Sequence, residues 1–82
     1  MLEIKTGSIV KSMAGHDSGT LFLVLRQEGD YVLLADGKRR KMEKPKRKKW
    51  KHVRLTDAQP ITITDDLTDK KIRTLLGAAR PR

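Results

Sequence analysis

The sequence predicts a small all-β core followed by a short C-terminal helix. Residues 8–13, 20–26 and 31–35 are dense in β-branched and aromatic side chains, and glycine or aspartate stands at the breaks between them, which is typical of successive strands. The run 20–26 is apolar on both faces. Such a run indicates a central strand that is covered twice, as in a small sheet that curls closed on itself.

A fourth strand is expected from the Asp36-Gly37 pair that follows the third run. This pair favours a type I′ hairpin turn, because that turn needs positive φ at both of its central residues. The turn would direct residues 38–42 back along the third strand as a paired, cationic strand. Residues 43–49 then combine like charges with Pro45, which indicates a loop or a mobile basic arm.

The last strand and the helix complete the expected architecture. Residues 50–55 alternate well enough to form a fifth strand, whose Trp50 would anchor the far end of the arm. A helix is expected over about residues 68–77, and Gly77 is its expected end. Its apolar stripe consists of Ile72, Leu75, Leu76 and Ala79. We expect residues 1–56 to form the barrel and residues 57–82 to form an extension whose helix packs across an open end.

Length and composition restrict the class of protein. The 82 residues leave room for one compact domain on one small core. The absence of cysteine excludes disulfides and zinc fingers. The first seven residues do not resemble a secretory signal, and the longest apolar run, residues 21–25, is far shorter than the about 20 residues that span a bilayer. We therefore expect a cytoplasmic protein with no membrane partner.

The charge indicates the kind of partner. Nineteen Lys and Arg against ten Asp and Glu give a net charge of +9, and such an excess costs folding free energy through self-repulsion. Of the seventeen residues 38–54, eleven are Lys or Arg, and only Glu43 opposes them. Because each neutralised phosphate releases counterions, this basic run (residues 38–54) predicts a nucleic-acid contact surface. The alternatives are a solvated charge run and a nuclear-import signal.

Two rings within the basic run indicate how bases could be contacted. Trp50, the only tryptophan, and His52 are suited to stacking on unpaired bases while cations hold the RNA backbone. The alternative for Trp50 is a position in the core or as a lid over it. The candidate RNA-binding residues are Lys11, His16, Lys38, Arg39, Arg40, Lys41, Lys44, Lys46, Arg47, Lys48, Lys49, Trp50, Lys51, His52 and Arg54.

Residues 6–24 carry a more specific pattern. A strand, a loop that contains Gly15 and Gly19, and a second strand make a tight unit in which glycine permits backbone angles denied to other residues. This unit resembles the KOW motif of ribosomal proteins and transcription elongation factors. The positions that match the structural pattern of the motif are Val10, Gly15, Asp17 and Gly19.

The resemblance extends into the basic run. With residues 31–38 and 44–49 included, the chain is similar to short bacterial KOW-domain RNA-binding proteins, and these are similar to the eukaryotic and archaeal large-subunit ribosomal protein family fourteen. The similarity covers about residues 6–56 and extends more weakly into the helix. Further matching positions are Lys38, Lys44, Pro45 and Lys46, whereas Ser18 and Arg39 depart from the pattern. The resemblance implies an SH3-like five-stranded barrel that contacts structured, ribosomal RNA.

Catalytic chemistry has little support in the sequence. Asp65, Asp66 and Asp69 cluster where the helix is expected to begin, and capping explains them better than acid catalysis does. His16 beside Asp17 is best explained by a hydrogen bond that orders the loop. We expect no enzymatic activity, no cofactor and no metal site.

The leading hypothesis is a monomeric, ribosome-associated protein that binds RNA through the basic run and the KOW loop. Its expected partners are ribosomal RNA and ribosomal proteins. One alternative is a KOW module that binds proteins of the ribosome or of RNA polymerase. Another is a protein that binds nucleic acids without specificity, which basic charge alone permits.

Overall fold

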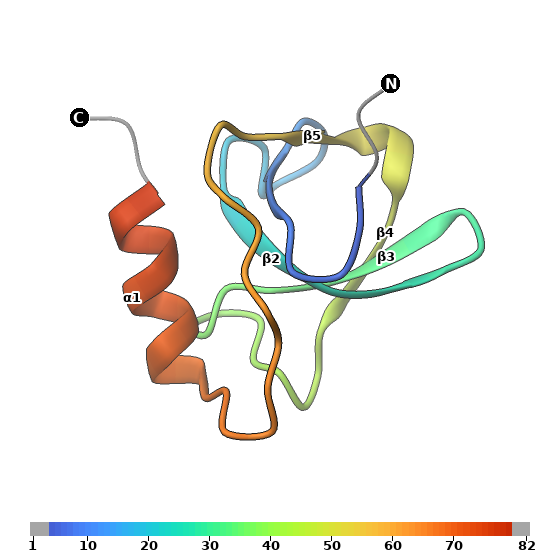
Figure 1. The fold of residues 1–82 in the computed structure, drawn as a ribbon. Helices are drawn as coiled ribbons and strands as arrows, with labels where there is room; N and C mark the ends of the chain where they lie inside the picture. Colours follow the sequence, from blue (N-terminus) through green and yellow to red (C-terminus); the bar gives the residue numbers. More distant parts are fainter. Residues whose placement is uncertain (1–3, 80–82) are drawn as a thin grey trace.

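The computed structural model describes residues 4–79, and within them it contains one five-stranded antiparallel sheet and one α-helix (Figure 1). The strands are β1 (Ile9–Ser12), β2 (Leu21–Glu28), β3 (Tyr31–Ala35), β4 (Lys46–Lys49) and β5 (Val53–Leu55), and the helix is α1 (Asp69–Ala79). The strand order is β4-β3-β2-β1-β5, so β2 is central and β4 and β5 are the edges. A 3-10 turn, η1 (Trp50–His52), connects the two edge strands.

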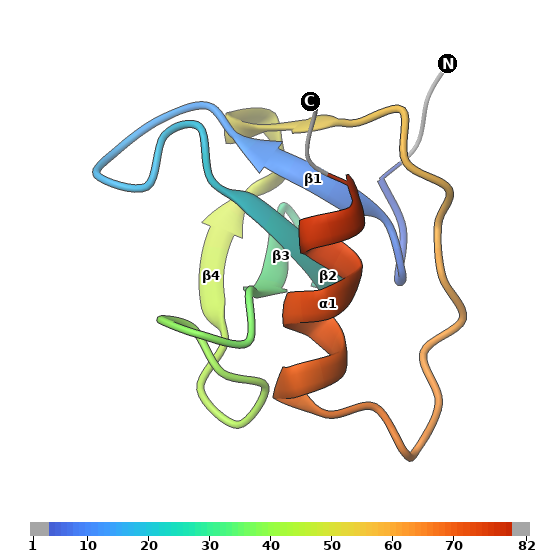
Figure 2. The same ribbon diagram turned by 90° about the vertical axis from the view of Figure 1, so that its left-hand side faces the viewer.

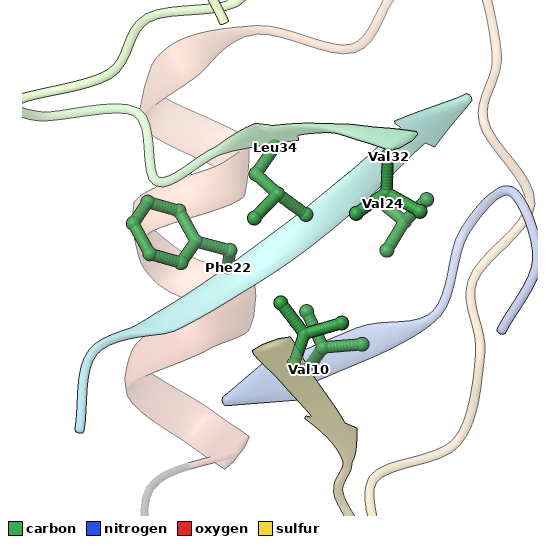
Figure 3. Close-up of a cluster of buried hydrophobic side chains, with 6 residues drawn as sticks. Val10, Phe22, Val24, Val32 and Leu34 are labelled. Carbon is green, nitrogen blue, oxygen red and sulfur yellow. The ribbon is translucent and has the colours of Figure 1, made fainter. Parts of the chain in front are cut away.

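Both faces of the central strand β2 are covered. Phe22 and Val24 point to one face and Leu21 and Leu23 to the other, as the two-residue period of a strand requires. The buried members of the inner cluster are Val10, Phe22, Val24, Val32, Leu34 and Val53, and those of the outer cluster are Ile9, Leu23, Ala35, Ile72 and Leu76. Figure 3 shows the inner cluster in front of β2 and α1 behind it. The prediction of a doubly covered strand is confirmed. The hydrophobic core is nevertheless divided into two clusters, one on each face of the sheet, where a single small core was expected.

The sheet curls without closing into a barrel. In a flat five-stranded sheet the edge strands would lie about 19 Å apart, at about 4.8 Å per strand. The three residues of η1 join β4 to β5 and advance only about 2 Å per residue, so these ends of the edge strands must lie close together. No ladder pairs β4 with β5 in the described part of the chain. The expected closed barrel is therefore replaced by an open, curled sheet.

The fourth strand is not where the sequence predicted it. Residues 38–42 form a loop because the Asp36 carboxylate accepts hydrogen bonds from the backbone N–H groups of Lys38 at 2.9 Å and Arg40 at 2.8 Å. Gly37 has a φ of 76°, but no non-glycine residue described here has positive φ. A type I′ turn, which needs positive φ at Asp36 as well, is therefore not formed, and the prediction of a strand at residues 38–42 is wrong.

The strand that pairs with β3 comes from the segment expected to be an arm. Tyr31 lies opposite Lys49, and Leu34 lies opposite Lys46. Pro45 directly precedes β4 and therefore removes no hydrogen bond from the ladder. The prediction of a loop or mobile arm over residues 43–49 is thus wrong for its last four residues, which form β4.

The C-terminal part differs from expectation in three details. Of the fifth strand predicted over residues 50–55, only the last three residues form β5, since η1 occupies the others. The helix α1 runs through Gly77, which therefore does not end it. The helix lies on the outer face of the sheet, where Ile72 and Leu76 pack against Leu23, and not across a barrel end (Figure 2). No described helix has the length and apolar character needed to cross a bilayer.

Candidate nucleic-acid interface

The basic run is distributed over three parts of the fold. It supplies the basic loop (residues 38–44), the edge strand β4, and η1 with β5. Nine of its eleven Lys and Arg side chains are exposed, namely Lys38, Arg39, Arg40, Lys41, Lys44, Arg47, Lys49, Lys51 and Arg54. His52 is exposed as well, as are Lys11 on β1 and His16 in the β1–β2 loop. The two exceptions, Lys46 and Lys48, lie on the same face of β4.

Lys46 and Lys48 point inward. They lie opposite Leu34 and Val32 of the inner cluster, and residues directly opposite across an antiparallel ladder share a face. The Lys48 side chain is 9 % exposed, and that of Lys46 is 25 % exposed. The prediction that Lys48 contacts RNA is therefore wrong, because its ammonium group is bound inside the protein. The Lys46 ammonium group is also paired inside the protein, although its side chain is less deeply buried.

Asp17 neutralises both inward lysines. Its carboxylate lies 2.7 Å from the Lys46 Nζ and 2.8 Å from the Lys48 Nζ, and it accepts a hydrogen bond of 2.8 Å from the Ser12 hydroxyl. Burial alone would raise the pKa of Asp17, but hydrogen bonds from Lys46, Lys48 and Ser12 and the charge of Lys48 hold this pKa well below its usual range. Asp17 is thus ionised at neutral pH.

Asp17, Lys46 and Lys48 form an ion cluster that fixes the β1–β2 loop against the edge strand β4. Lys48 also donates a hydrogen bond of 2.6 Å to the carbonyl oxygen of Ala14 in this loop. Gly15 and Gly19 both have positive φ, of 84° and 90°, which favours glycine at these two positions. The loop is ordered through Asp17 and Lys48, and not through the expected hydrogen bond between His16 and Asp17.

The outer face of β4 carries the exposed charges. Arg47 stacks over the Tyr31 ring, with its guanidinium carbon 3.8 Å from the ring centroid. Lys49 lies opposite Tyr31 across the ladder and is exposed. A stacked guanidinium keeps its donors in a fixed plane, which suits contacts to phosphates and to base faces. The contribution of Tyr31 was not foreseen, because the strand register that brings it to Arg47 depends on the misplaced fourth strand.

Trp50 lies on the surface between the two edge strands. Trp50 is 53 % exposed, so the alternative of a core position is wrong. Its backbone N–H donates a hydrogen bond of 2.9 Å to the carbonyl oxygen of Asp30, which holds η1 against the β2–β3 turn. Its neighbours Lys51 and His52 are exposed too. An exposed tryptophan among cations is suited to stacking on an unpaired base.

The basic loop is held in place by the helix. Its Met42 N–H donates a hydrogen bond of 2.9 Å to the Asp69 carboxylate, and the Arg73 guanidinium donates one to the carbonyl oxygen of Gly37. A Cβ at Gly37 would overlap the carbonyl oxygen of Asp69, so the loop and α1 are in direct contact (Figure 1). The sequence had assigned Asp69 to helix capping and Arg73 no role, because contacts across more than 25 residues leave no local signal.

Comparison with known proteins adds no relative. The chain matches no model of a known protein family, and a search of curated proteins found no significant match. Over residues 4–79, no three His, Asp or Glu side chains are placed so that they could hold a metal ion. The site is therefore interpreted from its own geometry and charge.

Proposed function

We propose that this protein binds structured RNA, and ribosomal RNA in particular, with a KOW-type variant of the SH3-like barrel. The observation that carries the proposal is the exposure of Trp50 among the nine exposed cations of the basic run. The cations supply attraction to phosphates that is independent of sequence. The indole ring supplies stacking, for which an unpaired base must be available.

RNA with unpaired bases is favoured over duplex DNA for the same reason. A base inside a regular duplex offers no free face to Trp50, whereas the loops and bulges of folded RNA do. The hydrogen bonds that hold these segments also favour a shaped partner: η1, which carries Trp50, is tied to the β2–β3 turn, and the basic loop is tied to α1. A non-specific basic tail would not need these contacts.

The fluorescence of Trp50, the only tryptophan, tests the proposal directly. The protein is titrated with a hairpin-loop RNA of ribosomal sequence, an RNA duplex and a DNA duplex, between 50 and 200 mM salt. We expect the tightest binding and the strongest quenching with the loop RNA. We also expect the logarithm of the association constant to fall linearly with the logarithm of the salt concentration, with a slope of about −0.7 to −0.9 for each phosphate contacted.

Two variants of equal charge complete the experiment. Arg47→Gln removes a cation from the exposed face of β4, and Lys71→Gln removes one from α1, outside the basic run. We expect the first to weaken RNA binding and the second to leave it nearly unchanged. Equal effects of both variants, or equal affinity for all three nucleic acids, would favour non-specific binding. Salt-independent affinity without quenching would favour a protein partner.

A further inference from the structure

A groove lies on the outer face of the sheet, between the C-terminal half of α1 and the segment that follows β5 (Figure 2). Its volume is about 1130 Å³. Pockets for drug-sized molecules reach about 1,000 Å³, so the groove has room for several side chains of a partner. The apolar residues that line it include Ile9, Leu21, Ala58, Ile61, Leu75 and Ala79.

The walls of the groove are fixed by contacts within the protein. The Ile61 N–H donates a hydrogen bond of 2.9 Å to the carbonyl oxygen of Gly7, and the Thr56 hydroxyl donates one of 2.8 Å to that of Ile9. A Cβ at Gly7 would overlap the carbonyl oxygen of Ile61. On the opposite side, Leu76 is buried in the outer cluster and holds α1 on the sheet. The groove is therefore preformed, and a ligand need not order it.

Two cations face each other beside the apolar lining. Lys11 of β1 lies directly opposite Arg54 of β5, both side chains are exposed, and both line the groove. Like charges that are directly opposite on one face of a ladder destabilise it. No ion pair within residues 4–79 involves either side chain, and none involves Asp57, which also lines the groove. The pair would be stabilised by an anionic group that a partner supplies.

The combination of charge and apolar surface indicates the class of partner. An RNA backbone would use the two cations but not the apolar walls, and no described residue that lines the groove is aromatic, so an unpaired base has no ring to stack on. A second copy of the chain would be repelled by its own net charge of +9. A protein segment with both acidic and apolar side chains uses both features, as amphipathic segments do in apolar grooves.

We infer that this groove docks an acidic, amphipathic segment of a partner protein. Apolar side chains of the segment pack against Ile61 and Leu75, and one of its carboxylates is bound by Lys11 and Arg54. This inference goes beyond RNA binding and does not depend on it, since Trp50 does not line the groove. It assigns Arg54, one of the nine exposed cations of the basic run, to a protein partner.

Peptide selection followed by titration tests the inference. A phage-displayed library of random peptides of about 16 residues is selected on the wild-type protein, because a peptide of this length can present one amphipathic face. We expect the selected peptides to share acidic residues next to apolar ones. A selected peptide is then labelled and titrated by fluorescence anisotropy at about 0.15 M salt, where charges more than about 8 Å apart are largely screened.

Two variants at neighbouring positions of α1 test the apolar wall. Ala78→Glu places a carboxylate in the groove, whereas Gly77→Glu adds the same charge where a Cβ meets no other atom within 4 Å and outside the groove. Both positions are exposed, and the melting temperature checks that both variants fold. Ala78→Glu should weaken peptide binding at least about tenfold, and Gly77→Glu should leave it nearly unchanged.

Two double variants of equal charge test the cation pair. Lys11→Gln/Arg54→Gln should lower the affinity for the peptide about tenfold without lowering the melting temperature, because it also removes the repulsion between the two side chains. Lys38→Gln/Arg47→Gln removes one lysine and one arginine that are exposed and lie outside the groove. This control should lower the affinity less than about twofold.

Three results would overturn the inference. They are selected peptides that lack acidic or apolar residues, equal losses within either pair of variants, and displacement of the peptide by hairpin-loop RNA together with an equal loss of RNA affinity in Lys11→Gln/Arg54→Gln. The last result would make RNA the occupant of the groove. Failure of the proposed function is distinct, because the peptide titrations contain no RNA. A protein that binds the peptide through the groove but binds no RNA would support the inference and contradict the proposed function.

Discussion

Neighbouring cations of β4 have different roles because alternate residues of a strand point to opposite faces. Lys46 and Lys48 form ion pairs with Asp17 beside the inner cluster, whereas Arg47 and Lys49 are exposed. A count of positive charge over the basic run therefore overstates the number of phosphates it can contact. Asp17 is the residue on which this division depends, since two largely buried ammonium groups need a counter-charge.

Replacement of Asp17 should be costly. Asp17→Asn leaves Lys46 and Lys48 without a negative partner, and the loss of one member of a buried ion cluster lowers the free energy of unfolding by on the order of 3 kcal/mol. Urea denaturation followed by circular dichroism measures this change. The control is Asp57→Asn, which removes the same charge from an exposed site and should change stability by less than about 0.5 kcal/mol. If the two variants are equally stable, the ion cluster does not stabilise the fold.

The same carboxylate predicts an acid-sensitive stability. The pKa of Asp17 in the folded protein lies below its unfolded value of 3.8, because the bonds from Lys46, Lys48 and Ser12 outweigh the opposing effect of burial. The stabilisation that ionised Asp17 contributes is therefore fully present well above pH 3.8. It is lost as the pH falls through 3.8 toward the pKa of Asp17 in the folded protein. We expect the stability difference between the wild type and Asp17→Asn to be constant from pH 7 to about pH 5 and to shrink by pH 3. A difference that grows on acidification would contradict this assignment.

Among the secondary-structure elements, the sequence predicted those that local pattern determines. The first three strands and the helix were found within two residues of their observed ends, because hydrophobic periodicity determines them. The double burial of β2 was also foreseen from its continuous apolar run.

The fourth strand was misplaced for a physical reason. The Asp36-Gly37 pair is compatible with two backbone conformations, a type I′ turn and a loop closed by the Asp36 carboxylate. Tertiary contacts decide which of the two forms. Gly37 is held against Asp69 by the helix, and Lys46 and Lys48 can enter a sheet because Asp17 neutralises them. Both conditions join residues that are far apart in the sequence. The charges of the basic run can thus be counted from the sequence, but their division into exposed and internal groups cannot.

The helix should position the basic loop for RNA binding. Asp69→Ala removes the acceptor of the Met42 N–H. The lost hydrogen bond contributes about 1 kcal/mol to the ordered position of the loop, so RNA affinity should fall roughly fivefold. A purely electrostatic surface predicts the opposite, because the variant has one negative charge fewer and should bind more tightly. Filter binding with the hairpin-loop RNA at fixed salt separates the two outcomes.

Asp69→Asn is the matched variant for this comparison. It removes the same charge but keeps a side-chain oxygen that can accept the Met42 N–H, so its affinity should equal or exceed that of the wild type. Thr68, and not Asp69, supplies the side chain that accepts the Lys71 N–H at the start of α1, so both variants retain a capped helix. Tight binding by Asp69→Ala would show that the order of the loop does not matter.

Over the whole molecule, the net charge of +9 costs stability through self-repulsion, whereas it would favour binding of the RNA proposed as partner. The radius of gyration is 11.3 Å, which is close to the Debye length of about 10 Å at 0.1 M salt. Repulsion between cations on different sides of the protein is therefore felt at low salt and screened at moderate salt. The Asp17 cluster lies largely out of solvent, where screening is weaker.

Added salt should consequently stabilise the free protein while it weakens RNA binding. Between 20 and 300 mM sodium chloride, relief of self-repulsion by about 1 kcal/mol would raise the melting temperature by roughly 4–8 °C for a domain of this size. Over the same range the affinity for RNA should fall, because the counterions displaced at each phosphate contact gain less entropy when they are released into a more concentrated salt solution. Thermal melts of the free protein and RNA titrations in the same buffers test the two trends together. A melting temperature that falls with salt would mean that exposed ion pairs contribute more to stability than self-repulsion costs, and the excess charge would then need no binding partner to explain it.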